Sequence, residues 1–330
     1  GTIPGALTQV KWEDWVAASR IGARHVRKRI SNNLPLVIVG YSNGGGLAVK
    51  YALDALDDTN LTLPDRLLLF SPEIAINPLA RIANFNKLLS YTSYFEKLKW
   101  ESIEPEYDPF KYNSFPMNAA RQAWEVTAAI DRQVQEAQDT GRFKDFPSVL
   151  TFLSWTDATV KTSATIQRLY SRLEKPGSEL IIFDVNRLDR IAFFIPAANE
   201  TPLLQLETSS DLPYQLTVIS NISNDSAKVA QKTKPPNSNI IDPEPLDMSW
   251  PSGIYSLSHV AIPFAPDDPV YGTGNMGGDY HGIPLGALQP RGETNLLVTP
   301  LNRLMRLRHN PFFAYVEHRV AAEIDKVLYK

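Results

Sequence analysis

A serine, an aspartate and a histidine occur in this chain in the order and local context that acyl transfer requires. Ser42 lies at the centre of residues 40–44, GYSNG, which match G-x-S-x-G. A serine hydroxyl is a weak nucleophile at neutral pH, so it needs a histidine base, and that histidine needs an acidic group to fix its tautomer. The pattern therefore predicts a Ser–His–Asp triad in which Ser42 is the nucleophile.

Asp157 is the predicted acid of this triad. It follows the apolar run 147–155, at the carboxyl end of an expected strand, where the catalytic groups of open α/β sheets gather. An aspartate at such a place also commonly serves as a turn or N-cap residue. Asp184, at the end of the next expected strand, is the alternative acid.

His259 is the predicted base among the five histidines of the chain. It lies downstream of both partners, in a loop between apolar stretches. The alternative base is His281, in a glycine-rich loop, and His259 would then be a structural histidine bonded to a neighbouring backbone group. His25 precedes the serine on the polar side of a helix, whereas His309 flanks the last helix, His318 lies in it, and both are expected at the surface.

The serine motif lies between an expected strand at 36–39 and an expected helix at 44–56. Strand, G-x-S-x-G and helix together form a nucleophile elbow, a turn sharp enough to strain the serine backbone. The short apolar run of the strand predicts burial on both faces. Side chains at Gly40 and Gly44 would be expected to collide with the neighbouring strand and helix. The competing interpretation is a glycine-rich turn that carries an inert serine.

Alternating strands and helices predict an α/β fold with a mostly parallel central sheet. Residues 1–72 form the first part of this core, residues 73–146 a helical, aromatic cap insertion, and residues 147–330 the second part. Residues 1–10 and 232–245 are expected to be loops. The expected strands beyond the serine motif are 66–71, 147–155, 179–184, 190–195 and 214–220, and the expected helices are 12–30, 118–139, 162–173 and 311–328, the last capped by Asn310.

The composition excludes several classes of function. The net charge of −3 provides no basic surface for nucleic acid, and the absence of cysteine excludes disulfides, thiol catalysis and thiolate metal sites. No apolar run is long enough to predict a membrane span. Residues 272–277 match G-x-G-x-x-G but lack the flanking strand and helix of a dinucleotide site. Asp267, Asp268, Asp279 and His281 could be drawn into a metal site, but their spacing does not demand one and a solvated loop is favoured, so no metal or cofactor is expected.

On these residues the chain resembles the α/β-hydrolase superfamily, and within it the capped lysophospholipase, monoacylglycerol-lipase and carboxylesterase group. The resemblance implies helices on both faces of the sheet, a helical cap, and cleavage of carboxylic esters with apolar or lipid-like acyl groups. It assigns Ser42, Asp157 and His259 to the triad and the backbone N–H of Asn43 to the oxyanion hole. The motifs that carry it are residues 40–45 (GYSNGG), 69–72 (LFSP), 157–160 (DATV) and 256–259 (SLSH), with 4–7 (PGAL) and 12–15 (WEDW) near the start.

The chain departs from the family pattern in two respects. His259 follows the 179–184 strand only after a long insertion. About four strands that normally precede the elbow are absent, together with the loop that provides the second oxyanion N–H, a donor whose loss costs about 10²–10³ in turnover. The elbow strand would also keep a free edge. These departures suggest a C-terminal portion whose first strands come from a separate polypeptide, without indicating a compartment. The alternative functions are an inactive scaffold that binds a ligand or partner, and a peptidase of the same fold.

Overall fold

The computed structural model describes residues 3–31, 34–75, 99–189, 201–273, 285–286 and 305–329. Within them, a central sheet has the strand order β1-β2-β5-β6-β7-β8-β9. The first five strands are parallel, and β8 and β9 are antiparallel additions. The strands are β1 (Val37–Tyr41), β2 (Arg66–Phe70), β5 (Ser148–Ser154), β6 (Glu179–Phe183), β7 (Gln215–Asn221), β8 (Lys228–Lys234) and β9 (Asp242–Ser249). This sheet confirms the predicted mostly parallel α/β architecture.

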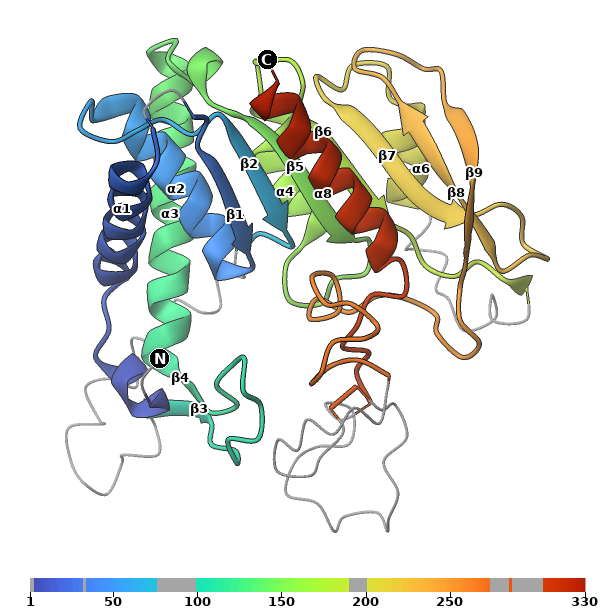
Figure 1. Ribbon diagram of the computed structural model, residues 1–330, viewed down its shortest axis with the longest axis horizontal. Coiled ribbons are helices and arrows are strands. Elements are labelled where there is room, and N and C mark those ends of the chain that lie inside the picture. The colour runs from blue at the N-terminus through green and yellow to red at the C-terminus, as the bar shows by residue number, and fades with distance from the viewer. Residues whose placement is uncertain are drawn as a thin grey trace.

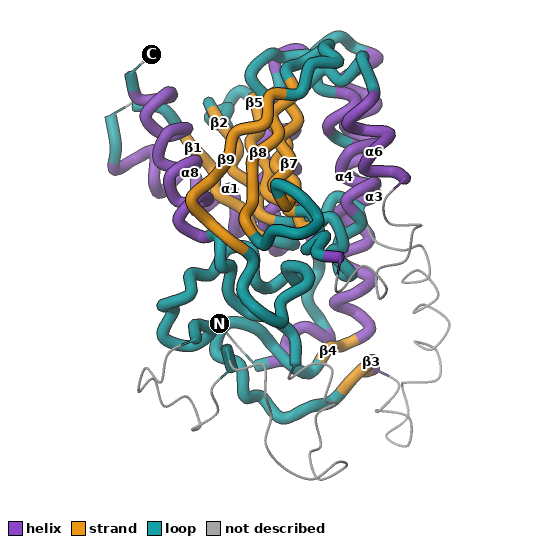
Figure 2. Tube along the Cα trace, turned by 90° about the vertical axis from the view of Figure 1, so that its right-hand side faces the viewer, coloured by secondary structure: helices purple, strands orange, loops and turns teal. Residues whose placement is uncertain are grey.

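Helices cover both faces of the sheet, as expected for an α/β-hydrolase fold (Figures 1 and 2). Successive residues of a central strand point to opposite faces of the sheet, and both faces here are apolar. Leu67 and Leu69 belong to one apolar core, and Leu68 and Phe70 belong to the other. The second core is covered by α8 (Phe313–Leu328). The first core is covered by α1 (Trp12–Arg29), α2 (Asn43–Asp57), α3 (Met117–Asp139), α4 (Thr162–Arg168) and α6 (Thr201–Thr208).

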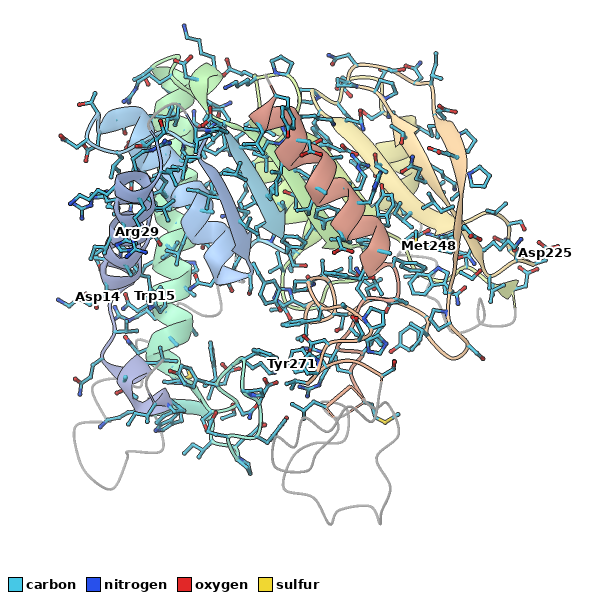
Figure 3. All side chains as sticks on the ribbon, in the orientation of Figure 1. Asp14, Trp15, Arg29, Asp225, Met248 and Tyr271 are labelled. Atoms are coloured by element: carbon cyan, nitrogen blue, oxygen red, sulfur yellow. The ribbon has the colours of Figure 1, made fainter. Side chains whose placement is uncertain are left out.

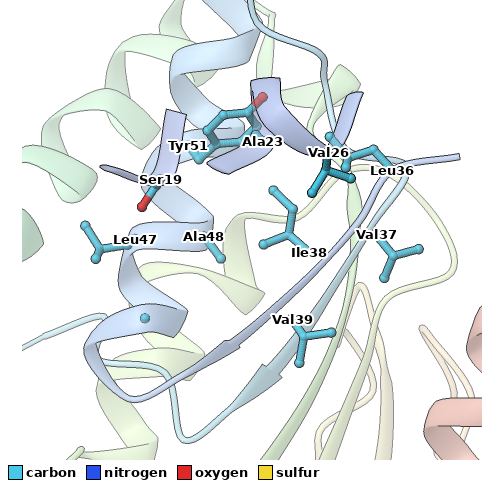
Figure 4. A pocket seen from close by; sticks show the side chains of 11 residues that line it. Ser19, Ala23, Val26, Leu36, Val37, Ile38, Val39, Leu47, Ala48 and Tyr51 are labelled. Atoms are coloured by element: carbon cyan, nitrogen blue, oxygen red, sulfur yellow. The ribbon is translucent and has the colours of Figure 1, made fainter. Parts of the chain in front are cut away.

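Strand β1 is the edge of the described sheet. It pairs with β2 alone among the described strands, and Val39 is 60% exposed. The prediction that this strand is buried on both faces is therefore wrong, because the side chain of Val39 on one of those faces is exposed. A pocket of about 390 Å³ lies along β1 (Figure 4), and its lining includes Ala23, Val26, Val37, Val39, Leu47 and Ala48. Pairing of a separate polypeptide with this edge stays a prediction.

Part of the segment predicted as a cap is described. Its helix α3 packs Val126, Ile130 and Val134 into the same core as α2. Ahead of α3, a short antiparallel ribbon joins β3 (Trp100–Ser102) to β4 (Phe115–Pro116). Residues 76–98 lie outside the described residues, so the helical cap and its boundaries stay a prediction.

Two loop predictions are wrong. Residues 4–8 form a 3₁₀ helix, η1 (Pro4–Thr8), which begins with the proline favoured at a helix start. The expected surface loop 232–245 contains the end of β8 and the start of β9, so the loop itself is limited to residues 235–241. Proline lacks an N–H and is tolerated at a sheet edge, which is why Pro243 and Pro245 fit β9. The expected strand 190–195 lies outside the described residues.

The last helix begins later than predicted. Its first residue is Phe313 rather than Pro311, and Asn310 belongs to the turn that precedes it. The side-chain oxygen of Asn310 accepts the N–H of Phe312 at 2.9 Å, and its amide donates to the carbonyl of Ile262 at 3.2 Å. Asn310 therefore ties the start of α8 to the loop that carries His259. None of the described helices combines the length and apolarity needed to cross a bilayer.

Candidate active site

Ser42 lies in a strained turn between β1 and α2. Its φ of 54° and ψ of −124° are disfavoured for any residue with a side chain. The Ser42 N–H donates to the carbonyl of Phe70 at 3.0 Å. Its own carbonyl accepts the N–H groups of Gly45, Gly46 and Glu73, at 2.9, 3.2 and 2.9 Å. These four backbone hydrogen bonds hold the serine in the strained conformation.

Close packing around this turn explains the need for glycine at one of the two predicted positions. A Cβ at Gly40 would lie 2.6 Å from the carbonyl oxygen of Gly44 and 2.7 Å from Cα of Gly45. A Cβ at Gly44 would meet nothing within 4 Å, so the expected collision there is wrong.

The close approach that sequence reasoning missed lies one and two residues further along, at Gly45 and Gly46. A Cβ at Gly45 would lie 2.7 Å from Cβ of Pro72, and one at Gly46 would lie 2.7 Å from the carbonyl oxygen of Glu73. In the sequence, the uninterrupted run of glycines at 44–46 was the feature that could have indicated this close approach. The chain that leaves β2 thus packs directly on the first turn of α2.

Asp157 and His259 lie together. Nδ1 of His259 is 2.8 Å from Oδ2 of Asp157, and the two side chains are 6% and 0% exposed. The other carboxylate oxygen of Asp157 accepts the N–H groups of Thr159 and Val160 at 2.8 and 2.9 Å. The carboxylate is thus fixed by its own turn and can orient the imidazole.

Hydrogen bonds and charge keep the Asp157 carboxylate ionised. Burial alone would raise its pKa, but the hydrogen bond and charge of His259, with the N–H groups of Val160 and Thr159, outweigh burial and lower the pKa. An ionised Asp157 stabilises the imidazolium that forms when a histidine accepts a proton.

The loop that carries His259 is fixed from two sides. The Ser154 hydroxyl, at the end of β5, donates to the carbonyl of Leu257 at 2.8 Å. The Ser258 hydroxyl donates to the carbonyl of Leu307, in the segment that leads to α8. His259 therefore sits at the carboxyl end of β5 although it lies 102 residues from Asp157 in the chain.

Tyr41 connects the serine turn to the histidine. The Tyr41 hydroxyl lies 3.5 Å from the carbonyl oxygen of His259, and the two rings are 5.2 Å apart between centroids, tilted by 32°. Burial and the charge of Asp157 raise the pKa of Tyr41, so its hydroxyl stays a neutral donor. The sequence analysis did not identify Tyr41, and its position next to Ser42 was the only feature that could have indicated this contact.

The Ser42 hydroxyl makes no hydrogen bond within the part of the chain that the structure describes.

Asn43 is the first residue of α2. Its N–H has no acceptor within the helix, and it lies where the helix dipole favours negative charge. Its assignment to an oxyanion hole stays a prediction.

The structure describes the alternative acid, Asp184, but not the alternative base, His281. The Asp184 carboxylate accepts hydrogen bonds from Arg187 at 2.5 and 2.9 Å and from the Ser220 hydroxyl at 2.8 Å. Among described residues, none of its hydrogen bonds involves a histidine. His281 lies outside the described residues. His309 is buried rather than exposed as predicted, and burial lowers its pKa.

A buried ionic cluster anchors the loops beside the site. Tyr271, labelled in Figure 3, donates its hydroxyl to Asp108 at 2.5 Å, and Arg308 donates to the same carboxylate at 2.8 Å. The Asp108 side chain is 0% exposed, so its charge is compensated inside the protein. These contacts join the loop between β3 and β4 to the segments before and after residues 274–304.

The loop residues discounted as metal ligands are only partly described. Asp268 accepts the N–H groups of Val270 and Tyr271 at 2.9 and 2.8 Å, as a turn aspartate does. Asp267 is exposed, and Asp279 and residues 274–277 lie outside the described residues. Within the described ranges, no three His, Asp or Glu side chains gather as metal ligands.

Neither a family model nor a curated protein matches this sequence. Among solved structures, the chain is similar to a soluble variant of monoglyceride lipase from Saccharomyces cerevisiae, determined in complex with a substrate analogue. The two are 12% identical, with a TM-score of 0.36, and the match covers 52% of this chain and 59% of that chain. The chain thus matches less than two thirds of that lipase.

The contact between Gly45 and Pro72 predicts a specific sensitivity to substitution. We expect Gly45→Ala to lower the free energy of unfolding by about 1–3 kcal/mol, because the new Cβ must displace backbone. Gly44→Ala is the matched control and should leave that free energy unchanged or raise it by up to about 1 kcal/mol, because alanine favours a helix. Urea unfolding followed by tryptophan fluorescence measures both. Equal effects of the two variants would contradict the packing described.

The lowered pKa of Asp157 predicts a pH dependence of stability. An ionised Asp157 stabilises the folded protein above the usual aspartate pKa of about 3.9, and this contribution is lost as the pH falls through the lower folded value. We expect wild type to be more stable than Asp157→Asn at pH 5, with a difference that shrinks below about pH 4. Urea unfolding from pH 2 to pH 6 measures it, with the exposed Asp267→Asn as control. A difference that does not change over this range would refute the prediction.

Proposed function

We propose that this protein is a serine hydrolase that cleaves carboxylic esters of apolar or lipid-like acyl groups. The observation that carries the proposal is the 2.8 Å contact between His259 and the buried side chain of Asp157, at the same edge of the sheet as a strained serine turn. Ser42 and Asp157 follow parallel strands whose carboxyl ends lie at one edge of the sheet, since Tyr41 is in register with Phe70 and Phe70 with Phe152.

Each residue then has one role in the reaction. Ser42 attacks the ester carbonyl while His259 takes the proton of its hydroxyl, and Asp157 holds the imidazole and stabilises its positive charge. The N–H of Asn43 donates to the oxyanion, assisted by the helix dipole. His259 returns the proton to the leaving alcohol, and a water molecule activated by the same histidine hydrolyses the acyl-enzyme.

Exposed apolar side chains in the segment between β3 and β4 support an apolar substrate. Phe110 is 54% exposed although it packs against Phe264 and Tyr271, at centroid distances of 5.4 and 5.2 Å. Ile103 is 61% exposed in the same loop. An acyl chain that covered these groups would remove apolar surface from water.

One observation favours an inactive scaffold as the second candidate. The Ser42 hydroxyl has no hydrogen-bond partner among the described residues, whereas an assembled triad requires a bond to His259. Such contacts are often long in proteins without substrate and tighten when it binds.

Turnover of nitrophenyl esters with acyl chains of increasing length tests the proposal. We expect a burst of nitrophenol equal to the enzyme concentration, and a kcat/KM that rises about threefold to fourfold per CH₂ while the chain gains apolar contact. Ser42→Ala should lower kcat by about 10³ or more, whereas the exposed Ser252→Ala should not change it. Turnover unaffected by Ser42→Ala would contradict the proposal, cleavage of amides alone would indicate a peptidase, and no turnover would favour the scaffold.

A further inference from the structure

The aromatic ring of Tyr41 lies against the imidazole of His259. The two ring centroids are 5.2 Å apart, and the ring planes are tilted by 32°. Tyr41 packs against the core that α8 covers, and Leu257 and Ala261, on either side of His259, belong to the same core. The end of β1 and the loop that carries the histidine therefore share one packed surface. Paired rings of this kind attract each other beyond the apolar area that they bury.

Tyr41 and Asp157 restrain different parts of the imidazole. Asp157 holds it at one atom, since Nδ1 of His259 lies 2.8 Å from Oδ2 of the carboxylate. A ring held at one atom can still tilt about that atom, and the direction of Nε2, across the ring, changes with the tilt. The Tyr41 contact involves the ring itself, so it opposes such a tilt. Nε2 is the atom that takes the serine proton in a Ser–His–Asp triad.

The backbone that carries Tyr41 also carries the nucleophile. Tyr41 is the last residue of β1, in register with Phe70, and Ser42 is the next residue of the chain. The Ser42 N–H donates to the carbonyl of Phe70 at 3.0 Å, and the Ser42 carbonyl accepts three further N–H groups. Because these hydrogen bonds fix the backbone of the turn, an imidazole that rests on the Tyr41 ring keeps a constant relation to the serine.

We propose that Tyr41 is a positioning residue that acts through His259 and holds Nε2 of the imidazole toward Ser42. Without the ring of Tyr41, the imidazole would stay bonded to Asp157 but would also adopt orientations in which Nε2 cannot reach the serine hydroxyl. Those orientations lower the fraction of molecules that can react and leave substrate binding unchanged. This inference rests on the proposed hydrolase function.

The geometry distinguishes the ring of Tyr41 from its hydroxyl. The hydroxyl lies 3.5 Å from the carbonyl oxygen of His259, which is the outer limit for a hydrogen bond. The ring contact is therefore the one that restrains the imidazole. Phenylalanine at position 41 keeps this contact, whereas leucine and methionine lack it.

Turnover of a nitrophenyl ester and the rate of fluorophosphonate labelling test the role of Tyr41. We expect Tyr41→Leu and Tyr41→Met to lower both kcat and the labelling rate of Ser42 by about 10- to 100-fold, because a small misplacement of a reacting group is that costly. KM should stay close to the wild-type value, since binding of the ester does not require the imidazole to be aligned. Tyr41→Phe should retain most of the wild-type kcat and labelling rate.

Tyr315→Leu is the matched control for a loss of packing. Tyr315 belongs to the same core, but its hydroxyl bonds to Gln231 and Arg319. We expect this variant to lower the urea midpoint and leave kcat unchanged. Urea midpoints also confirm that the Tyr41 variants are folded, and methionine, which fills much of the volume of the ring, serves if leucine unfolds the protein.

Four outcomes would overturn the role of Tyr41 while wild type remains active. They are an unchanged kcat in the folded variants without a ring, an equal loss of kcat in Tyr315→Leu, a change confined to KM, and a loss of kcat in Tyr41→Phe as large as in Tyr41→Met. Wild-type protein that neither cleaves the ester nor reacts with the fluorophosphonate would overturn the hydrolase proposal as well.

Discussion

The carbonyl oxygen of Ser42 accepts three N–H groups, two from the first turn of α2 and one from Glu73. This convergence holds the serine at a φ of 54°, and it requires the chain after β2 to approach α2 more closely than side chains would allow. Gly40, Gly45 and Gly46 permit that approach. Strain at one residue is thus balanced by backbone packing around it, as is common where a functional group must be aimed.

The rest of the candidate site depends on the parallel sheet. The carboxyl ends of β1, β2 and β5 lie at one edge of the sheet, so Ser42, Glu73 and Asp157 lie at the same edge although they belong to three separate segments. His259 has no strand of its own. Its position is set by the hydrogen bond from Ser154 to Leu257 and by the Asp157 carboxylate, which leaves the imidazole little freedom to turn away.

The sequence predicts an element correctly where its pattern of apolar residues matches the burial of that element in the fold. The run 67–70 is apolar on both faces because β2 lies between two strands and two helix layers. β1 carries the same kind of run at the sheet edge, where Val39 is exposed, so the pattern alone could not tell an edge from a centre. Prolines indicated a loop at 232–245, yet an edge strand tolerates them.

For the candidate site, residue type and order were enough to bring forward Asp157 and His259, which the structure places 2.8 Å apart. The contacts of Gly45 with Pro72 and of Tyr41 with His259 were not predictable, because each joins segments distant in sequence. His309 was misjudged for the same reason, since it is buried and its Nδ1 lies 3.2 Å from the carbonyl oxygen of Tyr271, 38 residues earlier in the chain.

The most direct measurement is labelling with a fluorophosphonate, followed by peptide mass spectrometry to locate the adduct. The reagent requires a serine made nucleophilic by a correctly placed base. The account predicts one adduct per chain, on Ser42, and its loss in both Ser42→Ala and His259→Ala. Folded wild-type protein that carries no adduct, or an adduct on another residue, would contradict the claim that this turn and the Asp157–His259 pair form one catalytic site.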